Sequence, residues 1–348
     1  EENNMPLPFL IAGLAAVAGV AGVGSGIQGG IKMKEANDTL AAAKKKQENA
    51  VELFEKRKAQ TNELMDSVGK QELKILKSFE EFSNTIEKIQ GRPEFKSYRT
   101  EGINLPEYKA EELKEVATGA GVLLGGIGGA AAGTAGGFAA AGATTSAVMA
   151  LGTASTGAAI SSLSGVAATN ATLAAIGGGA ISAGGGGMAL GSAILGGATL
   201  GVGLLVGGVI FNVTGSKLSD KADEAYAQAK RTEKEVDKIV IYFGNLSTVA
   251  RSFKKALDEI ELQYRKRLVT LNHIVNISGK VNWFEFTEDE KKLTENIVLL
   301  VGMLYKMCKT SIVLKAENSD GFQSLNRYEV NGVVDEANKL VKKVENNA

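Results

Sequence analysis

Residues that could do chemistry are few in this chain of 348 residues, which holds one histidine, His273, and one cysteine, Cys308. One histidine and one cysteine cannot supply the ligands of a zinc site. Gly24-Ser-Gly26-Ile-Gln-Gly29 matches the dinucleotide-binding spacing GxGxxG, but no strand pattern precedes it, as such a site requires. The GxSxG spacing of a nucleophilic serine does not occur. We therefore expect no enzyme, no cofactor and no metal.

Both single groups lie in apolar helical patterns, which favour packing over reactivity. We expect Cys308 to be an inert core thiol and His273, near the apolar stripe of a long helix, to be a packed core histidine. The carboxylates are spread along the charged segments as a solvated helix face. Lys plus Arg equals Asp plus Glu, 39 each, so net charge gives no reason to expect nucleic acid as a partner.

The dominant feature is a run of 101 residues, 116–216, with no Asp, Glu, Lys, Arg, His or Pro, and with 28 Gly and 25 Ala. Exposed protein surface recruits charge, so an uncharged stretch of this length indicates lipid or permanent burial. Glycine disfavours helix in water, whereas lipid forces the backbone to satisfy itself as helix. We predict a Gly/Ala-rich membrane domain over 116–216, with a helical hairpin buried in a soluble oligomer as the alternative.

The first part of the run carries glycine at every fourth position. These glycines are Gly121, Gly125, Gly129, Gly133 and Gly137. Small residues at this spacing let helix backbones approach closely, so the pattern predicts helix association and a homo-oligomer.

The last part of the run, 188–213, is more apolar. Its predicted lipid-facing residues include Leu200, Leu204, Leu205, Val209 and Phe211. Twelve such Leu, Ile, Val and Phe residues favour insertion by roughly 4–7 kcal/mol. We expect transmembrane helices at 117–141 and 188–212. The Ser/Thr-rich middle, 142–187, would lie at the interface, form two further helices, or line a polar path.

The N-terminal segment 5–31 is a second uncharged stretch, long enough for a bilayer-spanning helix. Gly22, Gly26 and Gly30 recur at intervals of four and predict a second glycine zipper. An acidic start and the following Lys32 and Lys34 would leave the rest of the chain cytoplasmic if this segment spans. A buried helix and an unusual export signal are the alternatives.

Two amphipathic helical arms flank the uncharged run. The first arm and its connector occupy 32–115, with apolar residues at Met65, Val68, Leu73, Leu76, Phe79, Phe82, Ile86 and Ile89. The second, 217–278, steps by three or four through Val236, Ile239, Phe243, Leu246, Ala250, Phe253, Leu257, Ile260, Tyr264, Leu268, Leu271 and Val275. This spacing is coiled-coil-like, over roughly 80–90 Å.

So long a helix needs a partner along its stripe, and the first arm is the obvious antiparallel candidate. The run between paired arms would then return to its starting side, with two or four membrane crossings.

The C-terminal segment 279–348 is predicted to add two shorter helices. Thr287-Glu-Asp-Glu290 is a capping box that begins one of them, with a buried body around 297–301. The last helix has one apolar edge, made by Val330, Val333, Ala337, Leu340 and Val344. The fold class is therefore all-α: a long helical bundle or coiled coil with a Gly/Ala-rich helical membrane domain.

Long amphipathic helices on both sides of one uncharged segment resemble the layout of helical bacterial pore-forming toxins of the haemolysin B/cytolysin A type. In that family the apolar segment forms a tongue on a helical bundle and unfolds into the bilayer. Separately, 152–192, with the triple glycine at 177–179 and the cluster at 184–187, resembles the Gly/Ala-rich segment of the interferon-alpha-inducible small membrane protein family. That resemblance implies residence in intracellular membranes.

Together these features predict a membrane-inserting, oligomerising helical protein that perturbs or permeabilises a bilayer, toxin-like and pore-forming. It would be membrane-associated, with a cytoplasmic helical body or a soluble form that inserts. The alternative is a constitutive, non-lytic membrane protein whose helical arms bind a protein partner or act as a scaffold.

Overall fold

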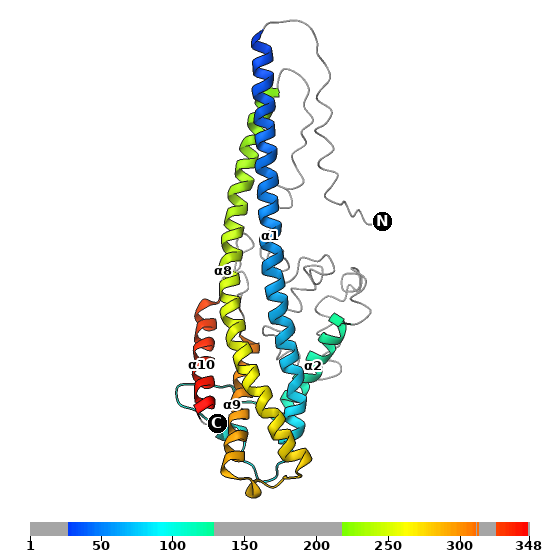
Figure 1. Cartoon of the computed structure of the whole chain (residues 1–348), viewed down its shortest axis with the longest axis vertical. Coiled ribbons are helices and arrows are strands. Elements are labelled where there is room, and N and C mark those ends of the chain that lie inside the picture. Colours follow the sequence, from blue (N-terminus) through cyan, green and yellow to red (C-terminus); the bar gives the residue numbers. More distant parts are fainter. Residues whose placement is uncertain (1–26, 129–217, 311, 313–324, 347–348) are drawn as a thin grey trace. The chain divides into compact units, whose positions relative to one another are not determined.

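The computed structural model describes residues 27–128, 218–310, 312 and 325–346, and within them the chain is all-α. Five long helices occur in this part of the chain: α1 (Ile27–Ile86), α2 (Ala110–Gly128), α8 (Leu218–Asn272), α9 (Glu288–Lys309) and α10 (Arg327–Asn346) (Figure 1). Single turns η3 (Phe95–Ser97), η6 (His273–Ile277) and η7 (Trp283–Glu285) lie between them. The predicted all-α class is confirmed.

The chain divides into two compact units. Unit 1 is Glu1–Arg57 with Leu200–Tyr242, and unit 2 is Lys58–Thr199 with Phe243–Ala348. Helices α1 and α8 each contribute one section to unit 1 and another to unit 2, whereas α2, α9 and α10 belong to unit 2.

The apolar stripes predicted on the two arms are buried. Every one of the eight stripe residues of α1 and its end, from Met65 to Ile89, has at most 3 % of its surface exposed. The twelve stripe residues of the second arm, from Val236 to Val275, are buried as well. Because apolar side chains recur every three or four residues, each helix buries one continuous face and leaves its charged face to solvent.

Unit 2 has an aromatic core in which tyrosines and phenylalanines from four segments meet. The Phe79 ring packs edge-on against Tyr264 and Tyr305, with centroids 6.1 and 6.4 Å apart. Tyr108 adds an edge contact with Tyr305 at 6.3 Å, and its buried hydroxyl donates to the Val298 carbonyl at 2.5 Å. Edge-to-face pairs add to the stabilisation from apolar burial, so this cluster fixes α1, α8 and α9 against one another.

Helix α9 begins at the predicted capping box. The Glu290 amide donates to the Thr287 hydroxyl at 3.3 Å, and the Thr287 amide donates to the Glu290 carboxylate at 2.8 Å. Lys280 also donates to Glu290, at 2.9 Å. Burial would raise the pKa of Glu290, but the bonds from Lys280 and Thr287 outweigh it and lower this pKa below 4.5.

Helix α10 is held on unit 2 by its apolar edge and by a buried arginine. The five predicted edge residues, from Val330 to Val344, are all buried. Arg267 donates from Nη2 to the Val344 carbonyl at 2.8 Å and from Nη1 to the Gln263 side chain at 2.6 Å. A cation at the last turn of a helix satisfies carbonyls that have no partner within the helix.

The turn after α1 is built around a glycine. Gly91 has φ +73°, and a Cβ there would lie 3.3 Å from Cε2 of Phe284. The Gln90 amide donates to the Val281 carbonyl at 2.7 Å, and the Trp283 amide donates to the Gln90 carbonyl at 2.9 Å. Only glycine fits this left-handed, crowded position without strain.

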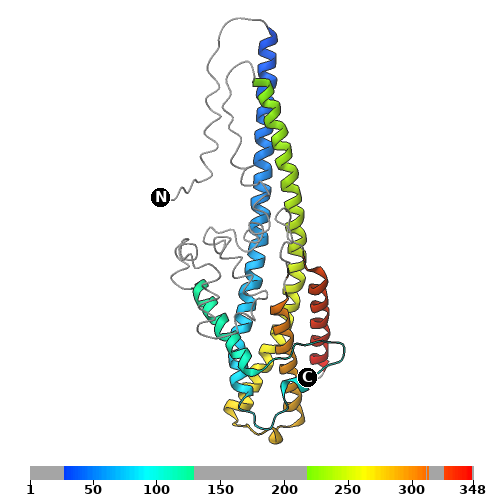
Figure 2. The same ribbon diagram turned by 180° about the vertical axis from the view of Figure 1, so that it is seen from behind.

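Helices α1 and α8 run parallel, so the predicted antiparallel arrangement is wrong. In unit 1, Lys46 contacts Glu233, 187 positions later. In unit 2, Thr61 contacts Ser247 and Thr85 contacts Asn272, 186 and 187 positions later. A constant difference in residue number means that both helices run in the same direction, as Figures 1 and 2 show. An antiparallel pair would instead keep the sum of the two positions constant.

The parallel direction removes the argument for an even number of crossings. Helix α1 ends in unit 2, whereas α8 begins in unit 1. The premise of that argument, an antiparallel pair of arms, therefore does not hold.

Replacing Thr287 with Ala is expected to lower the free energy of unfolding by about 1 kcal/mol, because the Glu290 amide loses its acceptor at the start of α9. Urea unfolding followed by circular dichroism measures this change. Thr287→Ser keeps the hydroxyl and serves as the control. Equal stability of the Ala variant and the parent protein would contradict the assigned role of the cap.

Acid should weaken the same element. A carboxyl group whose pKa is lowered by folding stabilises the protein above its unfolded pKa, and this stabilisation is lost as pH falls through the folded value. For Glu290 the loss is therefore expected below about pH 4.5, the usual pKa of a glutamate. The difference in unfolding free energy between parent and Glu290→Gln should shrink as pH is lowered from 7 to 3. A difference that stays constant over this range would contradict the lowered pKa.

Candidate functional site

Most residues predicted to meet lipid or to associate lie outside the described part of the chain. Of these residues, Gly121 and Gly125 lie in α2, and Gly30 lies in the first turn of α1. The others, Gly22, Gly26, Gly129, Gly133, Gly137, Leu200, Leu204, Leu205, Val209 and Phe211, are outside the described residues.

The expectation of a transmembrane helix is wrong for the residues that the structure describes. None of the helices in this part of the chain is long and apolar enough to cross a membrane. The reason is visible in α2, which contains the first residues of the predicted span at 117–141. This helix begins with Glu111, Glu112, Lys114 and Glu115, and its described part ends at Gly128.

The beginning of the uncharged run is part of unit 2. Val116, Ala117 and Ala120 are buried, each with at most 1 % of its surface exposed. The preceding turn is held by side chains, because Tyr305 donates to the Glu112 carboxylate at 2.6 Å and Lys114 forms an ion pair with Glu87. The chain therefore enters the run from a fixed point on the helical body.

Gly121 is half-buried and does not owe its identity to crowding within the described residues. A Cβ added there would lie 4.0 Å from Cε of Lys77, which is an ordinary van der Waals contact. Alanine would fit the site and would favour helix by about 1 kcal/mol. The described packing of unit 2 thus gives no reason for the first glycine of the zipper.

In unit 1 the two parallel helices approach each other through alanines. Ala43 packs with Ala225 and Ala229, with the partly buried Leu40 beside them. Ala36, Ala50 and Ala222 are buried too. Lys46 donates to both oxygens of Glu233 at 2.7 and 2.6 Å, and this hydrogen bond raises the pKa of Lys46. The small side chains allow the two helices to approach closely, and the ion pair fixes which residues of α1 lie beside which residues of α8.

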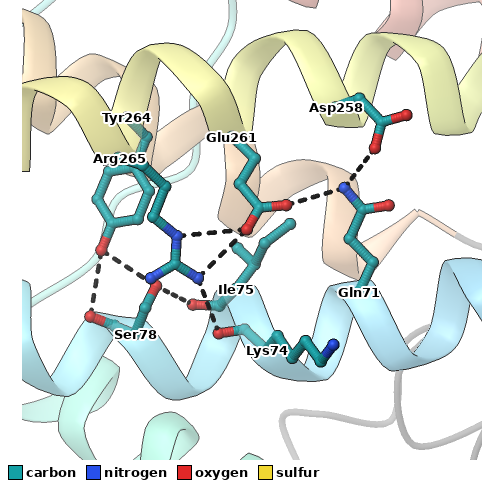
Figure 3. A network of polar contacts seen from close by, with 8 residues as sticks. All are labelled: Gln71, Lys74, Ile75, Ser78, Asp258, Glu261, Tyr264 and Arg265. Carbon is teal, nitrogen blue, oxygen red and sulfur yellow. Dashed lines mark hydrogen bonds and ion pairs between the residues drawn. The ribbon is translucent and has the colours of Figure 1, made fainter.

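In unit 2 a seam of polar contacts joins α1 to α8 (Figure 3). The Gln71 side chain donates to Asp258 at 2.7 Å and to Glu261 at 2.8 Å, while Lys254 donates to the side-chain oxygen of Gln71, Oε1, at 2.8 Å. The amide of Gln71 is thus enclosed by three charged groups of the other helix. Only one register places it there.

The seam continues further along both helices, reaching Ser78 about two turns after Gln71 on α1. The Tyr264 hydroxyl donates to the Ser78 carbonyl at 3.1 Å and lies 3.2 Å from the Ser78 hydroxyl. Burial raises the pKa of Tyr264, so it stays a neutral donor. Figure 3 shows the Arg265 guanidinium between the Glu261 carboxylate, at 3.2 Å, and the Lys74 carbonyl, at 3.4 Å.

Beside this seam lies a polar groove of about 870 Å³. It is lined by Lys74, Lys77, Ser78, Glu80, Glu81, Asn84, Thr85, Lys88, Arg265, Asn272 and Asn276. Four of these residues are cations and two are carboxylates, and Thr85 and Asn276 both donate to the side-chain oxygen of Asn272. Among the described residues that line the groove there is no histidine or cysteine.

Cys308 and His273, the two side chains considered first for chemistry, do not line this groove. Cys308 is buried, and burial together with the carboxylates of Glu72 and Glu261 raises the pKa of its thiol well above 9.0. The predicted core position of this thiol is confirmed. His273 is exposed, so the expectation of a packed histidine is wrong. It lies between the buried Leu271 and Val275 and points to the opposite face.

Comparison with known proteins gave no match: no family model, no curated protein and no solved structure is similar to this chain.

The parallel register can be tested by cross-linking within unit 2. The hydroxyls of Thr61 and Ser247 are buried and 3.2 Å apart. Thr61→Cys with Ser247→Cys should therefore form a disulfide on mild oxidation, seen as a shift in non-reducing electrophoresis. Ser78→Cys with Ser247→Cys places the first thiol 17 residues, about 25 Å, further along α1 and should not cross-link. Preferential cross-linking of this control pair would contradict the register.

Proposed function

We propose that this protein is a non-enzymatic helical protein that associates with lipid bilayers and permeabilises them as a homo-oligomer. The observation that carries this proposal is the uncharged run at 116–216, which leaves a charged helical body through α2 and rejoins it at α8. The two parts would have different roles, because the body assembles and the run acts on lipid.

The partition of charge supports this division. All 78 charged residues lie outside the run, on helices whose described sections bury apolar faces against one another. The body thus has the composition of a water-exposed protein, whereas the run has that of a segment that avoids water. The regular three-and-four spacing along α1 and α8 supports a coiled-coil-like arm.

The glycine spacing supports assembly of several copies. Gly121 is not required by crowding against Lys77, yet glycine recurs every four residues from there to Gly137. Each glycine lowers helix stability in water. Close contact between helix backbones in an apolar medium would offset this loss. Association of runs from several copies would supply that contact.

The likeness in layout to helical bacterial pore-forming toxins points the same way. In both cases long amphipathic helices enclose one uncharged segment. We extend to this chain the part of that likeness which concerns function, namely that the segment acts on a bilayer while the helices carry and assemble it.

A second candidate is a non-lytic membrane protein whose helical body is a scaffold for a protein partner. It is favoured by apolar side chains on the solvent face of α8 and the turn that follows it, where Ile241, Val269 and Ile277 are 65, 70 and 75 % exposed. Each of these exposed side chains is available to contact another protein. Bilayer association without leakage would distinguish this candidate from the first.

Leakage of a self-quenched dye from liposomes tests the proposal. The purified full-length protein should release the dye, and Leu204→Lys with Val209→Lys should reduce the release at least tenfold. A lysine in hydrocarbon costs about 2.5–3.5 kcal/mol, so two of them oppose entry into lipid strongly.

The matched control places the same two charges on the body, as Ile241→Lys with Val269→Lys, where both side chains are already exposed. This variant should leak like the parent, and circular dichroism should show equal helix content in all three proteins. Absence of leakage by the parent at any lipid composition, or equal loss in both variants, would contradict the proposal.

A further inference from the structure

The solvent face of α8 in unit 2 carries a stripe of charged groups and an imidazole at heptad spacing. Glu259, Lys266 and His273 follow one another at intervals of seven residues, so they share one face of the helix. Lys266 and His273 are exposed, and Glu259 is half-buried with a long ion pair to Lys255 at 3.9 Å. Leu262, between the first two, has 53 % of its surface exposed. Within the part of the chain that the structure describes, this stripe is open to solvent.

Helix α10 carries a second stripe at the same spacing. Tyr328, Asp335 and Lys342 also recur every seven residues, and all three are exposed, Tyr328 by 95 % of its surface. Gly332 lies among them, and a Cβ added there would meet nothing within 4 Å. The described packing of unit 2 therefore does not require this glycine, although glycine lowers helix stability relative to alanine. It leaves a flat place on the stripe where a side chain of another molecule can lie.

The ionised groups of the two stripes lack partners that their neighbours have. Lys266, Asp335 and Lys342 form no ion pair with any described residue. The charged groups next to them are held in ion pairs within the chain: Lys254 with Asp258 at 2.9 Å, Arg265 with Glu261 at 3.2 Å, and Lys306 with Glu336 at 2.5 Å. The stripes therefore present charges that are available to another molecule.

The two stripes match in charge when they are placed antiparallel. Lys266 then lies opposite Asp335, and seven residues away Glu259 lies opposite Lys342. Opposite charges at such positions favour a pair of helices and fix its direction. A parallel placement would instead oppose Glu259 to Asp335 and Lys266 to Lys342, which sets acid against acid and base against base.

The same antiparallel register brings two rings together. Seven residues beyond Lys266, His273 falls opposite Tyr328. The sum of the residue numbers is the same for this pair as for Lys266 with Asp335, so one register forms both. Gly332, one turn after Tyr328, lets the partner helix come close. Tyrosine is enriched at the centre of protein interfaces because its ring buries a large area while its hydroxyl can still form a hydrogen bond.

Two copies of the chain are needed to form this arrangement. Within one chain, the section of α8 in unit 2 and helix α10 run in the same direction (Figure 1), and both stripes face solvent. A two-fold axis across the helices sets α8 of each copy antiparallel to α10 of the other, so the pair forms twice. A single chain supplies both halves of the charge pattern, which favours a second copy over an unrelated protein as the occupant.

We propose that the protein forms a two-fold dimer in which the α8 stripe of each copy, Glu259, Lys266 and His273, receives the α10 stripe of the other, Tyr328, Asp335 and Lys342. This inference goes beyond the proposed function, because it places an assembly surface on the helical body that acts without lipid.

Exchange of one charge pair tests the dimer on the full-length protein, by size-exclusion chromatography with light scattering. The parent should be a dimer in solution. Lys266→Glu and Asp335→Lys each set like charges opposite one another at both contacts, so each should weaken dimerisation by about tenfold or more. The double variant restores opposite charges with their signs reversed and should dimerise within about threefold of the parent.

Mixing the two single variants adds a test that a folding defect cannot imitate. Each variant alone opposes like charges, but a mixed dimer of the two has opposite charges at both contacts, so an equimolar mixture should recover dimers. Lys74→Glu, at an exposed position of α1, makes the same change of charge away from both stripes and should dimerise like the parent. Circular dichroism should show equal helix content in all variants.

A parent protein that is monomeric at every concentration would overturn the inference, as would single variants that dimerise like the parent. So would a double variant or a mixture that stays monomeric. Dye release from liposomes is measured separately on the same parent protein and does not depend on these results. If the parent dimerises as expected but releases no dye, the proposed bilayer function fails and the dimer stands.

Discussion

The parallel pairing of α1 and α8 is the constraint on which the rest of the molecule depends. Apolar faces drive the two helices together, but polar contacts fix their register: Lys46 with Glu233 in unit 1, and Gln71 with Asp258 and Glu261 in unit 2. A slip by one turn would separate these pairs, which are half-buried or exposed and contribute up to about 1 kcal/mol each. Polar contacts therefore specify the register of the two helices, and burial of their apolar faces drives their association.

The pairing also decides where the uncharged sequences leave the body. Helix α2 anchors the start of the run on unit 2 through Val116, Ala117 and Ala120, whereas its end rejoins the chain in unit 1 at α8. The N-terminal uncharged segment arrives in unit 1 as well, through α1.

Much of the body follows from the sequence because burial obeys helical periodicity. Three features depend only on the spacing of nearby residues, which a single sequence shows: the stripe from Val236 to Val275, the capping box at Thr287 and the buried thiol of Cys308. The relative direction of two paired helices cannot be predicted in this way, because an apolar stripe with steps of three and four can pack against a parallel or an antiparallel partner. The partners that decide direction, such as Thr61 with Ser247, are ordinary polar residues until both helices are aligned.

Two errors had causes that the sequence did contain. His273 stands two residues after Leu271, a rotation of about 200° on a helix, and so belongs to the outer face. The span expected at 117–141 begins directly after four charged residues, and its first turn is used by the core of unit 2. In both cases proximity in sequence to an apolar stripe was given more weight than the angle or the neighbouring charges.

A distance between spin labels at Ala41→Cys and Ala227→Cys tests the parallel register most directly, because both positions are exposed and lie in unit 1. The account predicts one narrow distribution at short distance, set by an interhelical separation of about 8–10 Å plus the two labels. A broad distribution, or a distance longer than about 40 Å, would contradict the parallel pair.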